Sequence, residues 1–376
     1  MKINVLYISH LHPPENELTR NIGGMQRVSL QLADELERNG GVNLIRLTNE
    51  TSWNLIALKS FYFLIKTFLT LPRLVKEQKI DVVLFSSMVT GSLAWFIRKR
   101  VKVPMVTITH GHDVTFSPAI YQWLVRKVFG ALDGVISVSS ATKEQCLARG
   151  LDPQKSVVLP NGFVPEQIEN EYDPAESRKY LNEHFGLQLN GVHLLLTVGR
   201  LIKRKGHSWF ISEVLPRIES PVVYIIIGDG PQGNTIKSLI SKSVSGVQIL
   251  NLGRQPDEVL KRAYSAASLF IMPNIRVPGD MEGFGVVLLE ANVANTPAVA
   301  SDIEGIRDVI KNGANGYKLP ALEADVFAKK IDDVLQNELD SLSASSRKYV
   351  YETFRWDVVA QRYVKYLQDV IDAKRL

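Results

Sequence analysis

The segment PNIRVPGDMEGFGVVLLE, from Pro273 to Glu290, holds the densest group of residues that could do chemistry. Glu282 is followed by a Gly-Phe-Gly turn and then by an apolar stretch typical of a helix. A helix N-terminus presents free backbone N–H groups, which bind phosphates or sugar hydroxyls. Glu282 in the loop and Glu290 about two turns into the helix could face one ligand and accept hydrogen bonds from its hydroxyls. Alternatively, the glycines serve only a turn and Glu290 is solvated.

A second cluster lies at VGRLIKRKG, directly after another apolar run. It contains four cations in six residues: Arg200, Lys203, Arg204 and Lys205. Gly199 and Gly206 flank these cations and allow the chain to turn tightly around an anion. An arginine fork and a mobile lysine charge together suit a diphosphate. The alternative is a solvated basic loop, but its place at the end of a strand favours a functional role.

A third segment, Thr109-His-Gly-His-Asp113, follows a predicted strand. Two histidines and a carboxylate could suggest zinc, but no further nitrogen or sulfur donor lies at a suitable spacing. We therefore expect no metal site here and interpret His112 and Asp113 as acceptor-binding. Asp113 could receive or orient a hydroxyl proton, and its role stays open.

The elements that position these residues alternate between short β-branched runs and helical stretches, a pattern that predicts α/β architecture with doubly wound parallel sheets. A helix is predicted at Met25–Arg38, and a polar linker with a short helix at Pro165–Asn190. Strands are predicted at Ile3–Ser9, Val42–Leu47, Val82–Ser86, Met105–Thr109, Gly134–Val138, Val157–Leu159, Val192–Gly199, Val222–Gly228, Val247–Leu250, Leu269–Met272 and Pro297–Ser301. Ligands of such sheets bind at the carboxyl ends of the strands.

The length of 376 residues predicts two domains, because a single core rarely grows so large. We place them at 1–170 and 171–355, with a C-terminal helix at 356–376 that packs back toward the first domain. With 45% hydrophobic and 22% charged residues the chain is neither disordered nor fibrous. A single cysteine, Cys146, fits a reducing compartment. No signal peptide or membrane span is expected.

The net charge of +5 is unevenly distributed. Residues 1–170 carry 19 Lys and Arg against 14 Asp and Glu, whereas residues 171–376 carry 25 of each. Within residues 53–79 an apolar stripe at helical spacing is edged by lysines, so this helix either lies in a membrane interface or packs inside the fold. Nucleic acid binding is excluded, because the basic excess is too small and no recognition element is present.

Together, these motifs resemble the retaining glycosyltransferases of family four, which have the GT-B fold: two Rossmann-like domains facing across a cleft. The resemblance covers nearly the whole chain and is closest to bacterial phosphatidylinositol mannoside mannosyltransferases and exopolysaccharide glycosyltransferases. It rests on Gly23-Gly24, Thr109-His-Gly-His-Asp113, Val138-Ser-Ser140, Pro160-Asn-Gly162, Gly199-Arg200, Lys205-Gly206, Gly228-Asp-Gly-Pro231, Glu282-Gly-Phe-Gly285, Glu290 and Asn315-Gly316.

The resemblance implies roles for these residues. His110, Arg200, Lys205 and Glu282 would be catalytic: Arg200 and Lys205 would bind the donor diphosphate, Glu282 the donor sugar, and His110 would sit near the anomeric carbon. Donor-binding residues would be Gly23, Gly24, Gly199, Gly283, Phe284, Gly285, Val286 and Glu290. Gln26 would join His112 and Asp113 in binding the acceptor. No cofactor or metal is expected, because no Asp-x-Asp occurs and fixed cations can stabilise the departing phosphate.

Two segments depart from the family pattern. Asn161-Gly-Phe-Val164 replaces the usual Asn-Gly-Val-Asp, and Glu304-Gly-Ile-Arg-Asp308 replaces Gly-Gly-x-x-Glu. These departures put contacts to the acceptor and the nucleotide base in doubt. The turn at Gly228 has a structural and a nucleotide-binding interpretation.

The motifs and the resemblance together predict a metal-independent glycosyltransferase, and the resemblance alone implies that it retains configuration. It would move a hexose from a UDP-glucose-type donor or GDP-mannose to a lipid-linked or glycan acceptor in cell-envelope or exopolysaccharide synthesis. We expect it in the cytoplasm, peripheral to the inner face of the plasma membrane. Two alternatives stay open: a nucleotide-sugar epimerase of the same fold, and a non-catalytic scaffold that binds nucleotide and membrane.

Overall fold

The structure is a computed structural model that describes residues 2–12, 24–50, 56–165, 172–243 and 246–375. The chain forms two compact units. The first unit comprises residues 1–162 and 354–376, and the second comprises residues 163–353. The boundaries between the units therefore lie at Gly162 and Phe354, whereas we placed the domain boundaries at residues 170 and 355 from the sequence.

A six-stranded parallel sheet forms the centre of the first unit, in the order β2-β1-β3-β4-β5-β6. Its strands are β1 (Ile3–His12), β2 (Val42–Glu50), β3 (Val82–Phe85), β4 (Met105–Thr109), β5 (Gly134–Ser137) and β6 (Ser156–Val158). Its helices are α1 (Gly24–Arg38), α2 (Ile56–Glu77), α3 (Met88–Gly91), α4 (Leu93–Ile97), α5 (His112–Thr115), α6 (Ala119–Ala131), α7 (Ser140–Leu147) and α17 (Trp356–Arg375), with a 3-10 turn η3 (Pro153–Lys155). Strand β1 pairs with both β2 and β3, so the strand order reverses beside it.

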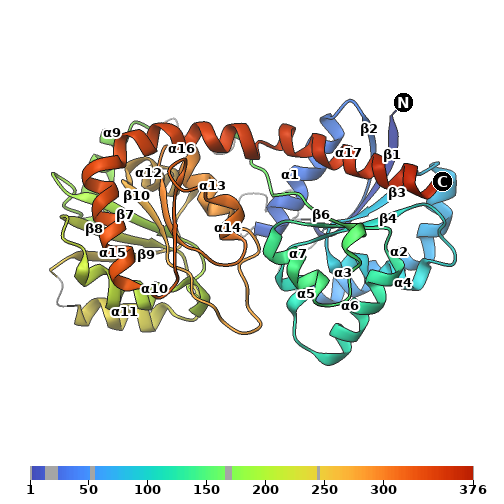
Figure 1. The fold of residues 1–376 in the computed structure, drawn as a ribbon, viewed down its shortest axis with the longest axis horizontal. Coiled ribbons are helices and arrows are strands. Elements are labelled where there is room, and N and C mark those ends of the chain that lie inside the picture. Colours follow the sequence, from blue (N-terminus) through green and yellow to red (C-terminus); the bar gives the residue numbers. More distant parts are fainter. Residues whose placement is uncertain (1, 13–23, 51–55, 166–171, 244–245, 376) are drawn as a thin grey trace. The chain divides into compact units, whose positions relative to one another are not determined.

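Helix α17 packs on α1 within the first unit, although it ends the chain. The indole of Trp356 donates a hydrogen bond of 2.9 Å to the side chain of Gln31. A Cβ at Gly162 would lie 2.5 Å from the Trp356 ring, so only glycine allows this close approach. Figure 1 shows the helix running alongside α1 toward the C-terminus.

The second unit repeats the architecture with a parallel sheet in the order β12-β11-β10-β7-β8-β9. Its strands are β7 (His193–Val198), β8 (Val222–Ile227), β9 (Gln248–Gly253), β10 (Leu269–Met272), β11 (Ala298–Ser301) and β12 (Gly316–Leu319). Its helices are α9 (Pro174–Phe185), α10 (His207–Trp209), α11 (Gly233–Lys242), α12 (Asp257–Ala266), α13 (Val286–Val293), α14 (Ile306–Val309), α15 (Ala324–Asp333) and α16 (Leu339–Phe354). Shorter turns are η4 (Lys203–Lys205), η5 (Phe210–Val214), η6 (Leu215–Arg217) and η7 (Val334–Glu338).

The central strands explain why the sequence predicted this fold. All six residues of β8 and all four of β3 are buried, as expected for parallel strands covered by helices on both faces. All eleven predicted strands are confirmed, with ends that shift by a few residues. Strand β12 was missed, because this edge strand is only half-buried and mixes polar with apolar residues.

Candidate functional site

The site in the second unit lies where the strand order of its sheet reverses. Strand β7 pairs with β8 on one side and with β10 on the other, so the loops that follow β7 and β10 are neighbours. In doubly wound sheets ligands bind at the carboxyl ends of the strands at such a reversal. The loop that begins at Gly199 carries the four cations noted in the sequence, and the loop that begins at Pro273 carries Glu282.

Gly206 brings these two loops into direct contact. Its φ is +68°, and a Cβ there would lie 1.8 Å from the carbonyl oxygen of Pro273, so no other residue fits. The backbone N–H of Ile275 also donates a hydrogen bond of 2.8 Å to the carbonyl of Arg204. The basic loop is thereby held against the segment that leads to Glu282.

The carboxylate of Glu282 is the centre of the site. Its Oε2 accepts hydrogen bonds from Lys205 Nζ at 2.6 Å, from the Arg204 guanidinium, and from Asn274 Nδ2 at 3.0 Å. Burial alone would raise the pKa of Glu282, but the neighbouring Lys205 and Arg204 outweigh it and lower the pKa to about 2. These three bonds from described residues all fall on one carboxylate oxygen, Oε2.

Lys205 is buried, which is uncommon for a lysine and requires an opposite charge nearby. Burial lowers the pKa of Lys205, and Glu282 acts in the opposite direction. A lysine ammonium has three donors, and Glu282 takes one of them. Lys205 can therefore keep its carboxylate partner and still contact an anionic ligand.

Arg204 was one of the four cations of the predicted basic cluster but was assigned no catalytic or binding role; the structure places it beside Lys205 and Glu282. Besides Glu282, its guanidinium donates a hydrogen bond of 3.0 Å to Asp280. Burial opposes the charged form, yet Glu282 and Asp280 raise the pKa of Arg204. The signal was present in the sequence, because Arg204 adjoins Lys205 and Asp280 precedes Glu282 by two residues.

A third loop, after β11, holds the backbone of Glu282. The N–H of Glu282 donates to the carboxylate of Glu304 at 2.5 Å, and the N–H of Gly305 donates to the carbonyl of Glu282 at 3.0 Å. A Cβ at Gly305 would lie 2.1 Å from the carbonyl oxygen of Gly283. The Glu304–Asp308 segment, which departs from the family pattern, therefore packs directly on the Gly-Phe-Gly turn.

Helix α13 follows this turn. Gly285 caps it with φ of +91°, and Phe284 is buried beside it. Because the helix begins at Val286, Glu290 is its fifth residue, so its expected position two turns into the helix is wrong. Glu290 is only 7% exposed and accepts a hydrogen bond of 2.9 Å from the Tyr264 hydroxyl, so the alternative of a solvated side chain is also wrong.

The other predicted residues of this unit differ in their surroundings. Arg200 is exposed, and no ion pair joins it to another described residue. Gly199 has φ of +149°, and Lys205 Nζ would lie 3.8 Å from a Cβ there. A Cβ at Gly228 would lie 1.9 Å from the carbonyl oxygen of Gly199, which gives Gly228 a structural role.

In the first unit, His110 directly follows β4 and Asp113 is the second residue of the short helix α5. The two carboxylate oxygens of Asp113 accept hydrogen bonds from the backbone N–H of His110 at 2.8 Å and of Met88 at 3.0 Å. His110 Nε2 donates to the carbonyl of Ser86 at 2.9 Å. Asp113 thus ties the loop after β4 to the loop after β3 and orients His110.

The remaining predicted residues of the first unit are placed as follows. His112 is exposed and meets the Phe116 ring edge-on at a centroid distance of 6.1 Å. Gln26 is buried in the first turn of α1, which begins at the exposed Gly24. Gly23 lies outside the described residues. Within the described part of the chain, no three His, Cys, Asp or Glu residues lie close enough to hold a metal.

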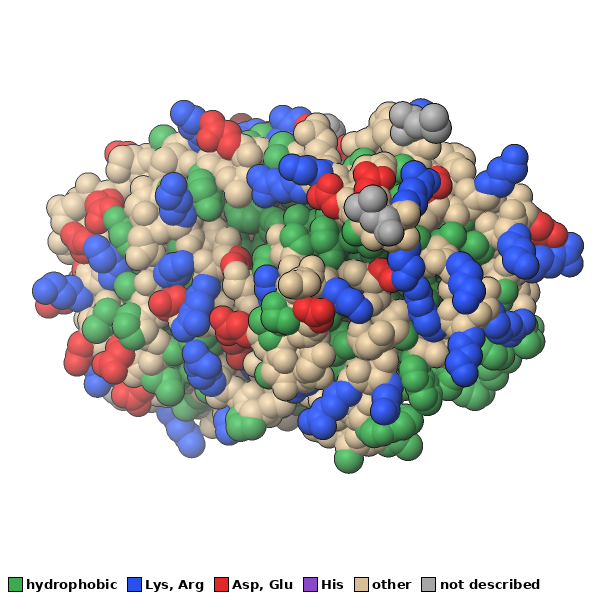
Figure 2. All heavy atoms as spheres, turned by 45° about the vertical axis from the view of Figure 1, so that its right-hand side comes forward, with side chains coloured by type: hydrophobic (Ala, Val, Ile, Leu, Met, Phe, Trp, Pro, Cys, Tyr) green, Lys and Arg blue, Asp and Glu red, His purple; other side chains and the backbone are tan. Residues whose placement is uncertain are grey.

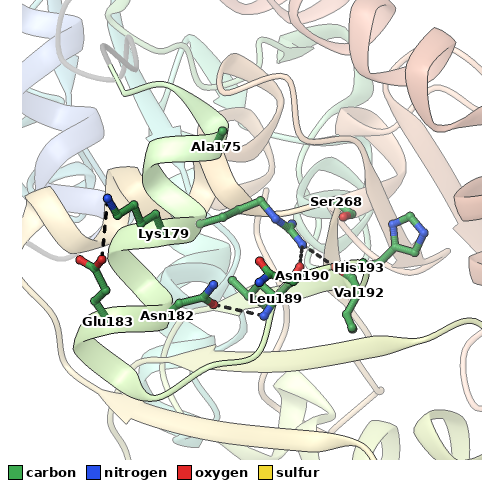
Figure 3. A pocket seen from close by; sticks show the side chains of 11 residues that line it. Ala175, Lys179, Asn182, Glu183, Leu189, Asn190, Val192, His193 and Ser268 are labelled. Carbon is green, nitrogen blue, oxygen red and sulfur yellow. Dashed lines mark hydrogen bonds and ion pairs between the residues drawn. The ribbon is translucent and has the colours of Figure 1, made fainter.

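A hollow of about 810 Å³ lies elsewhere on the second unit and is not this site. Figure 3 shows it between α9 and the segment that enters β7, lined by Lys179, Asn190 and His193. His193 begins β7, so the hollow lies at the amino end of the strand, whereas Lys205 follows its carboxyl end. The Arg178 guanidinium there is occupied by the carbonyls of Leu189 and Val192.

Comparisons with known proteins agree with this architecture. Residues 22–167 match the family model described as "Glycosyltransferase Family 4", and residues 180–353 match "Glycosyl transferases group 1". The chain is 26% identical to a "GDP-mannose-dependent alpha-(1-6)-phosphatidylinositol monomannoside mannosyltransferase" of Mycobacterium tuberculosis, over 79% of this chain and 78% of that protein. It is 27% identical to a "UDP-Gal:alpha-D-GlcNAc-diphosphoundecaprenol alpha-1,3-galactosyltransferase" of Escherichia coli, over 80% and 79%.

Solved structures share the fold over the full length. The crystal structure of Anabaena HepE in complex with UDP and glucose matches with a TM-score of 0.72 at 17% identity, covering 98% of this chain and 100% of that one. The expected GT-B fold is therefore confirmed. From these family matches and the two doubly wound sheets, we conclude that the chain belongs to the family 4 glycosyltransferases, enzymes that transfer sugars from nucleotide-sugar donors.

Proposed function

We propose that this enzyme is a retaining, metal-independent glycosyltransferase that moves a hexose from a nucleoside diphosphate sugar to a lipid-linked or glycan acceptor. The observation that carries the proposal is the cluster of Lys205, Arg204 and Glu282 where the strand order reverses in the second unit. It combines fixed cations for a diphosphate with a carboxylate for sugar hydroxyls. Retention of configuration follows from the family resemblance.

In the reaction, the bond between the anomeric carbon and the β-phosphate oxygen breaks, and its electron pair leaves with the nucleoside diphosphate. Lys205 and the exposed Arg200 would stabilise that charge, since preorganised cations lower the barrier where charge develops. The acceptor hydroxyl forms the new bond to the anomeric carbon and passes its proton to the departing β-phosphate oxygen. Because these cations supply the positive charge, we expect transfer to continue in EDTA.

Glu282 and Glu290 would hold two parts of the donor. Oε1 of Glu282 would accept a hydrogen bond from a sugar hydroxyl while Oε2 stays bonded to Lys205 and Arg204. Backbone N–H groups of Gly283 to Val286 would bind near the diphosphate at the start of α13. Glu290 would accept a ribose hydroxyl beside its Tyr264 partner. Gly23, Gly24 and Gly199 would let backbone approach the phosphates.

The first unit would bind the acceptor. His110 and the exposed His112 follow β4 at the carboxyl edge of its sheet, and Asp113 orients the loop. Gln26 starts the helix after β1 at the same edge. Of the similar proteins named above, one is named for GDP-mannose and phosphatidylinositol monomannoside, the other for UDP-Gal and a diphosphoundecaprenol-linked sugar. Both donor classes therefore belong in a screen.

The first experiment measures thermal stabilisation by UDP-glucose, UDP-galactose, UDP-N-acetylglucosamine and GDP-mannose. A donor present at about 100 times its dissociation constant adds roughly 2.7 kcal/mol of stability. The stabilising donor is then incubated with candidate acceptors, and nucleotide release and product are measured. Formation of a free epimer from donor alone indicates an epimerase. Equal nucleotide release by wild type, Lys205→Ala and Glu282→Ala would contradict the enzymatic proposal.

A further inference from the structure

The first unit exposes an unusual number of large hydrophobic side chains on one group of helices. Among the described residues, all such exposed side chains except Leu322 and Val326 lie between Leu58 and Trp123. They belong to α2, α4 and α6 and to the turn before α6, and these three helices pack in sequence, α2 on α4 and α4 on α6. Soluble proteins expose single apolar residues everywhere, but a contiguous patch marks an interaction site.

Helix α2 has two apolar faces. One face, with Phe63, Thr67 and Leu71, is buried against the core. The other carries Leu58, which is 71% exposed, and Tyr62, which is 69% exposed, each within the stripe noted in the sequence. The alternative that this helix packs inside the fold is therefore confirmed for α2 as a whole, but it packs through a different face and leaves the stripe exposed.

The apolar surface continues over α4 and α6. The rings of Trp95 and Trp123 meet edge-on at a centroid distance of 5.4 Å and join the two helices. Phe96 is 53% exposed beside them, and Ile120 is the most exposed of all at 79%. We call the exposed residues of these three helices the α2–α4–α6 surface.

The charge on this surface has one sign. Helices α4 and α6 contain no Asp or Glu, and α2 contains only Glu77, its last residue. Exposed cations include Lys59 and Lys66 on α2, and Arg126 and Lys127 on α6. Figure 2 shows hydrophobic side chains together with many Lys and Arg side chains on the lower right of its view. Lys127 also lies over the Trp123 ring, 5.9 Å from its centre.

These features together match a membrane interface and not a spanning segment. No helix in the described part of the chain is long and apolar enough to cross a bilayer. Helices that lie in the interface bury aromatic and aliphatic side chains below the headgroups and direct lysines to anionic lipid phosphates. The nearly uniform positive charge around the apolar side chains favours the anionic headgroups of a bilayer, whereas a protein partner would have to present a matching acidic surface.

The α2–α4–α6 surface reaches the loop proposed for the acceptor. Phe116 is 47% exposed, lies edge-on to His112 at 6.1 Å, and contacts the ring of Tyr121 at 5.5 Å. The Tyr121 hydroxyl donates a hydrogen bond of 2.5 Å to the carbonyl of Asp113. The start of α6 is therefore attached directly to the His110–Asp113 loop.

We propose that the α2–α4–α6 surface docks the protein on an anionic lipid bilayer and thereby presents the His110–Asp113 loop to acceptors whose lipid part is in that bilayer. The statement about the acceptor rests on the proposed function; the docking itself does not. The partner is the bilayer surface, held by apolar insertion together with attraction to anionic headgroups.

Vesicle flotation of the full-length protein tests the docking without any enzymatic reaction. Wild type should float with vesicles of phosphatidylcholine containing roughly 30% phosphatidylglycerol, and bind pure phosphatidylcholine about ten-fold more weakly. Leu58→Ser combined with Ile120→Ser should weaken binding about ten-fold or more, because both side chains are exposed and would insert. Leu322→Ser, which removes an exposed leucine of the second unit, is the matched control and should bind as wild type.

A charge series separates the two contributions. Lys59→Gln with Lys66→Gln should lose the preference for anionic vesicles, whereas the exposed Lys329→Gln should keep it. Thermal stabilisation by the nucleotide sugar is measured on every variant and should not change. Absence of wild-type binding to both vesicles, or equal binding by the double serine variant, overturns the docking even if donor binding persists. Vesicle binding without donor binding overturns only the proposed function.

Discussion

The Lys205 ammonium lies 2.6 Å from the Glu282 carboxylate, although 77 residues separate them in the chain. Both side chains are buried, and each stabilises the charged form of the other against burial. A buried pair of this kind costs desolvation energy and is weak evidence for stability. Under the proposed function, its position at the strand-order reversal explains why such a pair is present, since it would keep a cation and a carboxylate oriented before a ligand binds.

Replacing Lys205 by alanine should lower kcat for nucleotide release about 100-fold to 1,000-fold, because a preorganised cation would be lost where phosphate charge develops. Lys203→Ala is the matched control, since Lys203 is exposed on the same loop, and it should keep near wild-type activity. Initial rates over a donor concentration series measure both variants. Equal losses in the two would show that only the net charge of the loop matters.

Glu282→Gln should lower the free energy of unfolding by about 3–5 kcal/mol, because Lys205 and Arg204 would be left without their shared charge partner. Adding Lys205→Met should recover part of this loss, with a coupling energy of about 1–3 kcal/mol. Urea unfolding of the single and double variants measures the cycle. Additive losses of unfolding free energy would mean that Lys205 and Glu282 do not interact. Activity should stay low in the two single variants and in the double variant.

Gly305→Ala should disturb the site although it replaces none of the charged side chains there. The new methyl would approach the carbonyl of Gly283 at 2.1 Å and the nitrogen of Phe284 at 2.7 Å, so the Glu282 loop must move. We expect a stability loss of about 1–3 kcal/mol and a larger relative loss of kcat/KM. Gly233→Ala is the control in the same unit, because its nearest contact would be 3.9 Å away. Unchanged kcat/KM in Gly305→Ala would contradict the supporting role of this loop.

Stability should fall as pH drops from 6.5 toward 4. Burial lowers the pKa of His10 and of His207 from 6.5 to about 4, helped by His110 and Lys205 respectively. Between these values the unfolded chain binds protons that the folded chain does not, so acid favours unfolding by on the order of 3 kcal/mol for each histidine. Below pH 4.5 the unfolded chain protonates Glu282. The folded chain does not until about pH 2, because its pKa for Glu282 is lowered to about 2, so further stability is lost.

Unfolding in urea at a series of pH values measures this dependence. His207→Leu should reduce the slope between pH 6.5 and 4 by about half, because one of the two histidines no longer titrates. A flat stability profile in wild type would exclude the effect.

Asp113→Asn should act through the position of His110. The amide offers one acceptor oxygen where the carboxylate accepts from both His110 and Met88, so we expect a stability loss of about 1–3 kcal/mol and a lower kcat. The shape of the pH–rate profile should not change. Disappearance of its acid limb would instead make Asp113 a general base. Asp369→Asn, an exposed carboxylate of α17, is the control.

The sequence by itself predicted the two parallel sheets, because β-branched runs covered on both faces have a recognisable pattern. Buried strands such as Val222–Ile227 were found this way, while the half-buried Gly316–Leu319 was not. Glu282 was also singled out from residue type and position, whereas Lys205 was one of four cations that only the family resemblance told apart.

Which side chains meet became clear from the three-dimensional arrangement of the loops. Contacts of Arg204 with Asp280 and Glu282, and of the Glu304–Gly305 loop with the Glu282 backbone, join residues of separate loops. The burial of Glu290 and the exposure of the Leu58–Tyr62 face of α2 were likewise undetermined, since a helix with two apolar faces does not indicate which one contacts the sheet. Local pattern determines the elements of this protein, whereas the strand order and the glycine contacts between loops determine its site.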